Sequence, residues 1–262
     1  MARQRLALVT GGSSGIGAAT AAALAAKDWK VVIAARGEEA LARVRDRLTA
    51  AGGDVVSRAV DASDGTAVVA MAEQVLARDG VPDVIVNAAG AGEWRFIEDT
   101  PPAAALQMMG APYGAAFNVT HAFLAPMLTR GSGVLLHVGS PASLIPWPGA
   151  TAYASARWAL RGLHEALRQD LIGTGMHSCH VIFGEVSSPY FDTNAVPRDE
   201  LPRLSRWLPV TAPRECAQII VATIARPRSQ VLHPPVLRAL LASARLAPPI
   251  GRRLIAWGAP RH

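Results

Sequence analysis

Closely spaced glycines near the start of the chain could bind a phosphate group. The apolar segment Leu6–Thr10 runs into the turn TGGSSGIG at residues 10–17 and then into an alanine-rich helical stretch. Glycines let the chain turn tightly and bring backbone N–H groups close to an anion. The N-terminus of the following helix adds a partial positive charge, which favours a pyrophosphate. A strand, this turn and a helix in that order indicate a dinucleotide-binding unit.

A tyrosine and an arginine further along could support acid–base chemistry. Arg157 follows Tyr153 by four residues in a helical stretch, and this spacing brings both side chains onto one helix face. A free phenol has a pKa of ~10, which is high for proton transfer near neutrality. A neighbouring cation favours the phenolate and lowers this pKa. A role for this pair in acid–base catalysis is implied by a family resemblance that rests on further motifs of the chain.

Apolar segments of strand length alternate with longer, alanine-rich helical stretches. The strand candidates are nearly continuous in apolar residues, as is typical of strands buried on both faces. This rhythm predicts an α/β fold: a doubly wound, Rossmann-like parallel sheet of about seven strands with helices on both faces. The expected strands are Leu6–Thr10, Lys30–Ala34, Val55–Asp61, Val84–Asn87, Val134–Val138, Cys179–Phe183 and Gln230–His233. The expected helices are 15–27, 37–51, 63–79, 100–129, 152–173 and 211–226.

The chain shows no internal repeat and no low-complexity linker, so we expect a single nucleotide-binding domain over residues 1–235. This domain includes the loop 187–210, which is rich in Pro, Ser and Arg. Residues 236–262 form a Pro- and Arg-rich tail, which we expect to pack on the domain or at a subunit interface. Contact of this basic, apolar tail with a membrane surface is the alternative.

Composition excludes several classes of protein. A hydrophobic fraction of 50% and a mean hydropathy of +0.22 are far from a disordered chain. The net charge of +6 permits acidic partners, but the basic residues are spread out and not interleaved with aromatics, so no nucleic-acid surface is expected. No apolar stretch is long enough for a transmembrane helix. Two cysteines, Cys179 and Cys216, make neither a disulfide framework nor a metal site, and a cytoplasmic location is expected.

Further motifs follow the glycine turn in a fixed order. Asp61 closes the third expected strand, Asn87-Ala88-Ala89-Gly90 follows the fourth, and Ser140 follows the fifth, 13 residues before Tyr153. Residues 184–188 are similar to a Pro-Gly-x-Val-x-Thr stretch. With these motifs, the sequence resembles the short-chain dehydrogenase/reductase family from about residue 5 to 235.

The resemblance implies roles for individual residues. Ser140 would orient a substrate carbonyl, Tyr153 would donate or accept the proton, and Arg157 would stand where the family has a lysine that lowers the tyrosine pKa. The residues that would bind the cofactor are Gly11, Ser13, Ser14, Gly15, Ile16, Gly17, Arg36, Asp61, Asn87, Ala88, Gly90, Tyr153, Arg157, Gly184, Val186 and Ser188. No metal is implied.

Two positions depart from the family pattern. Arg157 replaces the lysine, and an arginine does not readily give up its proton because its pKa exceeds ~12. Ala111 falls where the family has an asparagine that holds a water beside that lysine. Only two of the 26 basic residues are lysines, so base composition can explain the arginine but not the missing asparagine.

Three interpretations follow from these departures. The protein is a reductase in which Arg157 is an electrostatic substitute for lysine, and protons arrive by another path. Alternatively, it binds NADP(H) with weak or no turnover, as a regulatory or scaffold protein. In the third interpretation, Tyr153 performs acid–base chemistry that is not redox chemistry.

The residues after the second expected strand bear on the choice of cofactor. An enzyme that selects NAD usually places an acid there to bind the ribose 2′-hydroxyl, whereas an arginine accommodates a 2′-phosphate. The chain reads Ala34-Ala35-Arg36, so NADP(H) is the expected cofactor.

Aromatic residues are scarce, at 5% of the chain, yet Trp94, Trp147 and Tyr190 fall in loops at the expected substrate end of the sheet. Ligand sites are mostly apolar, so we expect these residues, with Ser140, to bind a small hydrophobic carbonyl or alcohol. By resemblance, the helices at 100–129 and 152–173 form the interface of a homodimer or homotetramer. Pro112 should kink the first of them.

Overall fold

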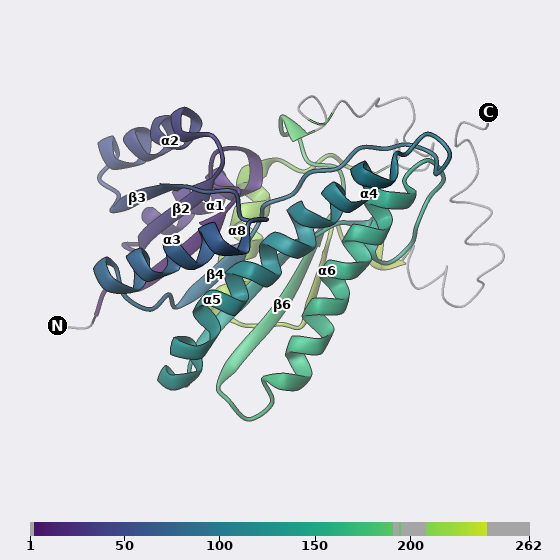
Figure 1. Ribbon diagram of the computed structural model, residues 1–262. Helices are drawn as coiled ribbons and strands as arrows, with labels where there is room; N and C mark the ends of the chain where they lie inside the picture. The colour runs from purple at the N-terminus through teal and green to yellow at the C-terminus, as the bar shows by residue number, and fades with distance from the viewer. Residues whose placement is uncertain (1–2, 191–193, 195–207, 240–262) are drawn as a thin grey trace.

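Seven parallel strands form one sheet in the computed structural model, which describes residues 3–190, 194 and 208–239 (Figure 1). The sheet order is β3-β2-β1-β4-β5-β6-β7, and every neighbouring pair is parallel. The strands are β1 (Leu6–Thr10), β2 (Lys30–Ala35), β3 (Val55–Ala59), β4 (Val84–Asn87), β5 (Gly133–Gly139), β6 (Met176–Phe183) and β7 (Gln230–His233). The expected doubly wound fold of about seven strands is confirmed.

Helices cover both faces of the sheet (Figure 1). Side chains of α1, α2 and α8 pack in one apolar cluster against the strands, and those of α3, α5 and α6 pack in a second cluster on the opposite face. The helices are α1 (Gly15–Ala25), α2 (Glu38–Ala50), α3 (Gly65–Arg78), α4 (Pro102–Met109), α5 (Ala115–Arg130), α6 (Thr151–Asp170) and α8 (Pro213–Ala225).

The central strand β1 shows why the strands are apolar throughout. Ala7 and Val9 belong to the first cluster, whereas Leu6 and Leu8 belong to the second, because successive side chains of a strand point to opposite faces. All five residues of β1 are buried. A sheet covered by helices on both sides leaves no position for an alternating polar residue.

The chain reverses its direction of winding between β1 and β4. From β1 it proceeds outward to β2 and β3, returns to β4 beside β1, and then proceeds outward in the other direction. At such a switch point the loops after the two central strands diverge and leave a crevice at the carboxyl ends of the strands. The glycine turn after β1 and the Ala88–Gly90 segment after β4 therefore lie side by side at this crevice.

The helix expected at 100–129 is divided by a π-helical turn at Gly110–Gly114. Pro112 has no N–H and its ring would clash with the carbonyl four residues earlier, so it disfavours a regular α-helix at this point. The turn widens instead, and the Ala115 N–H donates to the Gly110 carbonyl, five residues back. The expected interruption at Pro112 is confirmed, and its form is a π turn that carries Ala111.

Two expected strand boundaries are wrong by more than one residue. β3 ends at Ala59 and not at Asp61, because Ala59 pairs with Ala35, the last residue of β2, and the chain leaves the sheet where its partner ends. β6 begins at Met176 and not at Cys179, since Met176 pairs with Gly133 at the start of β5. Polar residues at the start of β6 hid this extension in the sequence.

The expectation of one domain over residues 1–235 stays a prediction. Most of the loop 187–210 and of the tail 236–262 lies outside the described residues. Both cysteines are free thiols buried in the core. Among the residues that the structure describes, no helix is long and apolar enough to cross a membrane.

Candidate active site

The glycine turn is held in a conformation that exposes backbone N–H groups. Gly11 and Gly15 have φ values of +66° and +51°, a region that other residues rarely adopt. A Cβ at Gly11 would lie 2.7 Å from the Ala88 carbonyl oxygen, so the turn packs directly against the loop after β4. Ser14 precedes α1 and its side chain makes no capping hydrogen bond, which leaves the first N–H groups of α1 available to an anion.

Thr10 joins the two loops at this switch point. Its Oγ1 accepts hydrogen bonds from the N–H groups of Ala88 and Ala89, each at 3.2 Å. Because Thr10 is buried at the last position of β1, these bonds fix the start of the β4 loop against the glycine turn. The tight packing predicted from the glycines is thus reinforced by a side chain that the sequence alone did not single out.

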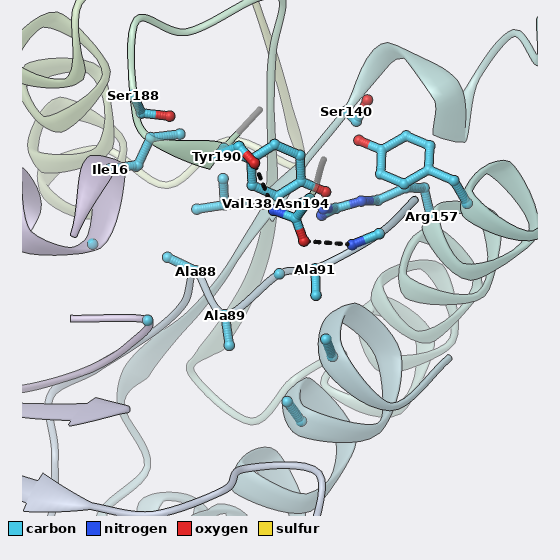
Figure 2. A pocket seen from close by; sticks show the side chains of 18 of the residues that line it. Ile16, Ala88, Ala89, Ala91, Val138, Ser140, Arg157, Ser188, Tyr190 and Asn194 are labelled. Atoms are coloured by element: carbon cyan, nitrogen blue, oxygen red, sulfur yellow. Dashed lines mark hydrogen bonds between the residues drawn. The ribbon is translucent and has the colours of Figure 1, made fainter. Parts of the chain in front are cut away.

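A cavity of about 1370 Å³ lies over the carboxyl ends of the strands. It extends from the glycine turn to α6, and Figure 2 shows several of the side chains that point into it. Residues predicted to bind the cofactor or the substrate that line it are Gly11, Ser13, Ser14, Gly15, Ile16, Gly17, Arg36, Asp61, Ala88, Gly90, Trp94, Ser140, Trp147, Tyr153, Arg157, Gly184, Val186, Ser188 and Tyr190.

Asn87 is the exception among the predicted residues. It is the last residue of β4, is 4% exposed and does not line the cavity. Its side-chain Nδ2 lies 3.3 Å from Nδ1 of His137 on β5. This contact places Asn87 beneath the β4 loop, and its predicted role in cofactor binding stays a prediction.

Arg36 and Asp61 mark one end of the cavity. Arg36 follows β2 directly and is exposed, and Ala35 beside it carries no acid. Asp61 accepts hydrogen bonds from Oγ of Ser63 at 2.7 Å and from its N–H at 2.9 Å. These bonds, with the nearby Arg36, hold the pKa of the Asp61 carboxyl below its usual range despite some desolvation. The geometry leaves Arg36 free to meet an added anionic group at this end.

Tyr153 and Arg157 lie one turn apart on the buried face of α6 at the other end. Both are only 6% exposed, and the guanidinium carbon of Arg157 is 5.0 Å from the centre of the Tyr153 ring, a cation–π contact. Nη2 of Arg157 donates to the hydroxyl of Tyr190 at 3.2 Å. Burial opposes the charge of Arg157, but Tyr153 and Tyr190 outweigh that cost and raise its pKa above the ordinary value.

Ser140 lies at the carboxyl end of β5, where it begins a short 3-10 turn, Pro141–Ser143. Its Oγ accepts a hydrogen bond from the Ala142 N–H at 3.3 Å, which leaves the hydroxyl proton available for a second partner. Ser140 and Tyr153 line the same cavity. Ala111, which stands where the family has an asparagine, also lines the cavity. The π turn places its methyl group in the cavity wall.

An aromatic wall closes the cavity beside Tyr153. The ring centres of Trp94 and Trp147 are 5.3 Å apart in an edge-to-face arrangement, and those of Trp94 and Tyr153 are 5.9 Å apart. Met108 and Ala142 pack in the same cluster. An apolar wall beside a hydroxyl-bearing pair suits a ligand with an apolar body and one polar reacting group.

Sequence reasoning missed Gly92 and Asn194. Oδ1 of Asn194 accepts from the Gly92 N–H at 3.1 Å, and Nδ2 of Asn194 donates to the Tyr190 carbonyl at 2.7 Å (Figure 2). Gly92 approaches Tyr153 so closely that a Cβ there would overlap the ring. An asparagine in a Pro- and Ser-rich loop is typical of a turn, so the sequence did not predict this contact.

The arrangement fits a nicotinamide dinucleotide. Unbonded N–H groups at the start of α1 suit the pyrophosphate, and the buried Tyr153–Arg157 pair at the far end suits a ribose and a reacting carbonyl. Among the described residues, no group of three or more His, Cys, Asp and Glu side chains is placed to hold a metal ion.

Comparisons with known proteins agree with this geometry. A family profile described as short chain dehydrogenase matches residues 5–198, more than half of the chain. A curated short chain dehydrogenase of Pseudocercospora fijiensis is 33% identical over 240 residues, which cover 87% of this chain and 78% of that protein.

Solved structures with nicotinamide cofactors are also similar. A short chain dehydrogenase/reductase from Burkholderia phymatum in complex with NAD is 25% identical, with a TM-score of 0.85 and 95% of each chain covered. A metagenomic short-chain oxidoreductase in complex with NADP is 28% identical, with a TM-score of 0.74, and the match covers 87% of this chain and 95% of that one. These matches support a nicotinamide dinucleotide cofactor. One of the two solved structures contains NAD and the other contains NADP.

Proposed function

Because the chain belongs to the short-chain dehydrogenase/reductase family of oxidoreductases, we propose that it transfers a hydride between NADP(H) and a small hydrophobic carbonyl or alcohol. One observation carries the proposal: Ser140, Tyr153 and the glycine turn line one continuous cavity. The site thus combines a place for a pyrophosphate with a place for a reacting carbonyl. Substrate and cofactor form are the two finer parts of the proposal.

The choice of NADP(H) rests on Arg36. The residue stands directly after β2 at the end of the cavity where a ribose 2′-group would lie, and Ala35 takes the position at which an enzyme that selects NAD usually has an acid. The solved relatives contain NAD in one case and NADP in the other, so family membership alone favours neither form.

In the proposed mechanism, the cofactor supplies or takes up the hydride when bound, and side chains of the protein handle the proton. Ser140 donates a hydrogen bond to the substrate oxygen and fixes its position. Tyr153 gives its phenolic proton to that oxygen during reduction and takes it back during oxidation. Arg157 lies against the Tyr153 ring and stabilises the phenolate that forms, as a permanent charge in a buried place.

The hydrophobic substrate rests on the aromatic wall. Trp94 and Trp147 face the reacting end, and Met108 and Ile145 also line the cavity there. We propose that this wall holds the apolar body of the substrate while Ser140 and Tyr153 meet its oxygen. A homodimer or homotetramer, a cytoplasmic location and membrane contact through the tail stay predictions.

The test is consumption of NADPH and of NADH with a matched panel of carbonyls that differ in apolar area. The proposal expects turnover with NADPH that increases in kcat/KM with apolar area. Uniform rates across the panel would contradict the substrate class, and a preference for NADH would contradict the cofactor.

A second candidate function is binding of NADP(H) without turnover. It is favoured by one observation: neither Arg157 nor Ala111 can pass a proton to solvent. Tight NADPH binding with no consumption of NADPH by any carbonyl would favour this candidate.

A further inference from the structure

The proposed reaction leaves one proton unaccounted for. After Tyr153 has given its proton to the product, another group must return one before the next turnover. Arg157 cannot serve because a guanidinium stays protonated, and the methyl group of Ala111 can hold neither a proton nor a water. A path that uses different residues is therefore needed, and this step rests on the function proposed above.

Tyr190 is the nearest candidate. Its hydroxyl accepts from Nη2 of Arg157 at 3.2 Å, and a single point, the Cβ that Gly92 lacks, would lie 3.4 Å from the Tyr190 oxygen and in overlap with the Tyr153 ring. The Tyr190 hydroxyl therefore lies near the edge of the Tyr153 ring beside Gly92, and the two phenols share a side-chain hydrogen bond. Arg157 is bonded to Tyr190 and stacked on Tyr153. Figure 2 shows the side chains of Tyr190 and Arg157 in the cavity.

The position of Tyr190 is set by its backbone. Asn194 binds the Tyr190 carbonyl through Nδ2 at 2.7 Å and the Gly92 N–H through Oδ1 at 3.1 Å. The bridge connects the segment that carries Tyr190 to the loop that packs on Tyr153. A side chain that only filled space would not need its backbone fixed to the opposite wall of the cavity.

The protonation state of Tyr190 suits a proton donor. Burial and the neighbouring Tyr153 raise the pKa of the Tyr190 phenol, and they outweigh the opposing effect of Arg157. Tyr190 is thus protonated near neutrality. Its hydroxyl accepts a bond from Arg157 and also shares a side-chain hydrogen bond with Tyr153. Because Tyr190 also lines the cavity, it can exchange its proton with solvent there.

We propose that Tyr190 is a second proton-transfer group of this site, which takes over the relay that Arg157 and Ala111 cannot provide. In reduction, the Tyr153 O–H breaks and its proton forms the O–H of the product. The Tyr190 O–H then breaks, and its proton restores Tyr153. Solvent in the cavity returns a proton to Tyr190, and oxidation runs through the same steps in reverse.

Tyr190→Phe tests the proposal because it removes one oxygen and keeps the ring. We expect kcat to fall roughly 10- to 100-fold, as for loss of a hydrogen bond to a charged group. We also expect small buffer acids at increasing concentration to restore kcat in Tyr190→Phe. Wild-type kcat should not respond to the buffer, because its relay is already in place.

Tyr113→Phe is the matched control. Tyr113 is the remaining tyrosine of the chain besides Tyr153 and Tyr190. It packs against Phe117 with ring centres 6.1 Å apart and does not line the cavity. The Tyr113→Phe variant should have wild-type kcat, and its kcat should not respond to the buffer acids.

A second readout needs no turnover. In ¹⁵N-arginine NMR spectra, the Arg157 guanidinium protons should exchange faster with water in Tyr190→Phe than in the wild type.

The outcomes separate this inference from the proposed function. If Tyr190→Phe keeps wild-type kcat, or loses kcat without rescue by buffer acids, the relay is wrong while the reductase stands. If wild-type protein transfers no hydride to any carbonyl, the proposed function fails first. Unchanged exchange of the Arg157 protons in Tyr190→Phe would refute the contact itself.

Discussion

The phosphate end of the cavity is built from backbone, whereas its reacting end is built from side chains of separate segments. At the phosphate end, Gly11 and Gly15 at positive φ and the unbonded start of α1 create the site. At the reacting end, Tyr153 and Arg157 come from α6 and are completed by Tyr190. A backbone site tolerates few changes in sequence, while a side-chain site can be rebuilt around a substitution such as Arg157.

The largest expected effect is at the reacting end. Tyr153→Phe should lower kcat by roughly 10²- to 10⁴-fold, the usual contribution of a positioned general acid, and should lower NADPH affinity far less, since it removes one hydroxyl at the ribose and no contact of the phosphate end. Turnover by absorbance and affinity by NADPH fluorescence measure the two. Equal losses in both quantities would mean that the ends are not separable.

The same contrast explains what the sequence could and could not predict. The seven strands and the glycine turn follow from apolar runs and glycine spacing, both of which are local signals. The Arg157–Tyr190 bond and the Asn194–Gly92 bond join residues 33 and 102 positions apart, so no local pattern announces them. The role of Asn87 in cofactor binding stays a prediction, because the last position of β4 suits both a supporting and a ligand-binding residue.

Acid should lower the free energy of unfolding, because three buried histidines lie beneath the reacting end of the cavity. His137 and His180 are paired neighbours on β5 and β6, and the His164 ring on α6 packs 5.4 Å from that of His180. Burial lowers the pKa of His137 from 6.5 to about 3, with a further lowering by His164. Burial also lowers the pKa of His164 to about 4.

The sign follows from the unfolded chain, in which histidine titrates at 6.5 and so binds protons first on acidification. The stability from neutral His137 and His164 is complete above pH 6.5 and is lost as the pH falls, at about 1.4 kcal/mol per unit, or about 3 kcal/mol each by pH 4. Burial also lowers the pKa of His180, so His180 adds to this loss. Denaturant unfolding at pH 6.5 and at pH 4 measures this loss of stability. His180→Leu should flatten the dependence, whereas the exposed His177→Gln should not; parallel curves for all three proteins would contradict the explanation.

A change at the phosphate end should weaken NADPH binding rather than slow the chemical step. In Gly17→Ala the new methyl group would overlap the Gly11 carbonyl, so NADPH affinity should fall about 10- to 100-fold, the cost of forcing a close-packed contact apart. Gly162 on α6 has open space around it, and Gly162→Ala should leave affinity unchanged. Titration of NADPH fluorescence decides the matter, and normal affinity in Gly17→Ala would contradict a backbone-built site.

The smallest expected effect concerns the exposed Arg36. Arg36→Ala should weaken NADPH binding about 10-fold, the lower range for a hydrogen bond to a charged group, and should leave NADH binding unchanged. Arg43 is exposed on α2, pairs with Glu39 at 3.8 Å and does not line the cavity, so Arg43→Ala is the control. Equal weakening of NADPH and NADH in Arg36→Ala would refute the assignment of Arg36 to the 2′-phosphate.

We expect that a site with Arg157 in place of lysine still transfers a hydride. The most direct test uses NADPH deuterated at the transferable position, the wild-type protein and a hydrophobic carbonyl, with mass spectrometry of the product. We predict one deuterium in the alcohol, and none when Tyr153→Phe replaces the wild type. Tight NADPH binding with no deuterium in any product would contradict the claim.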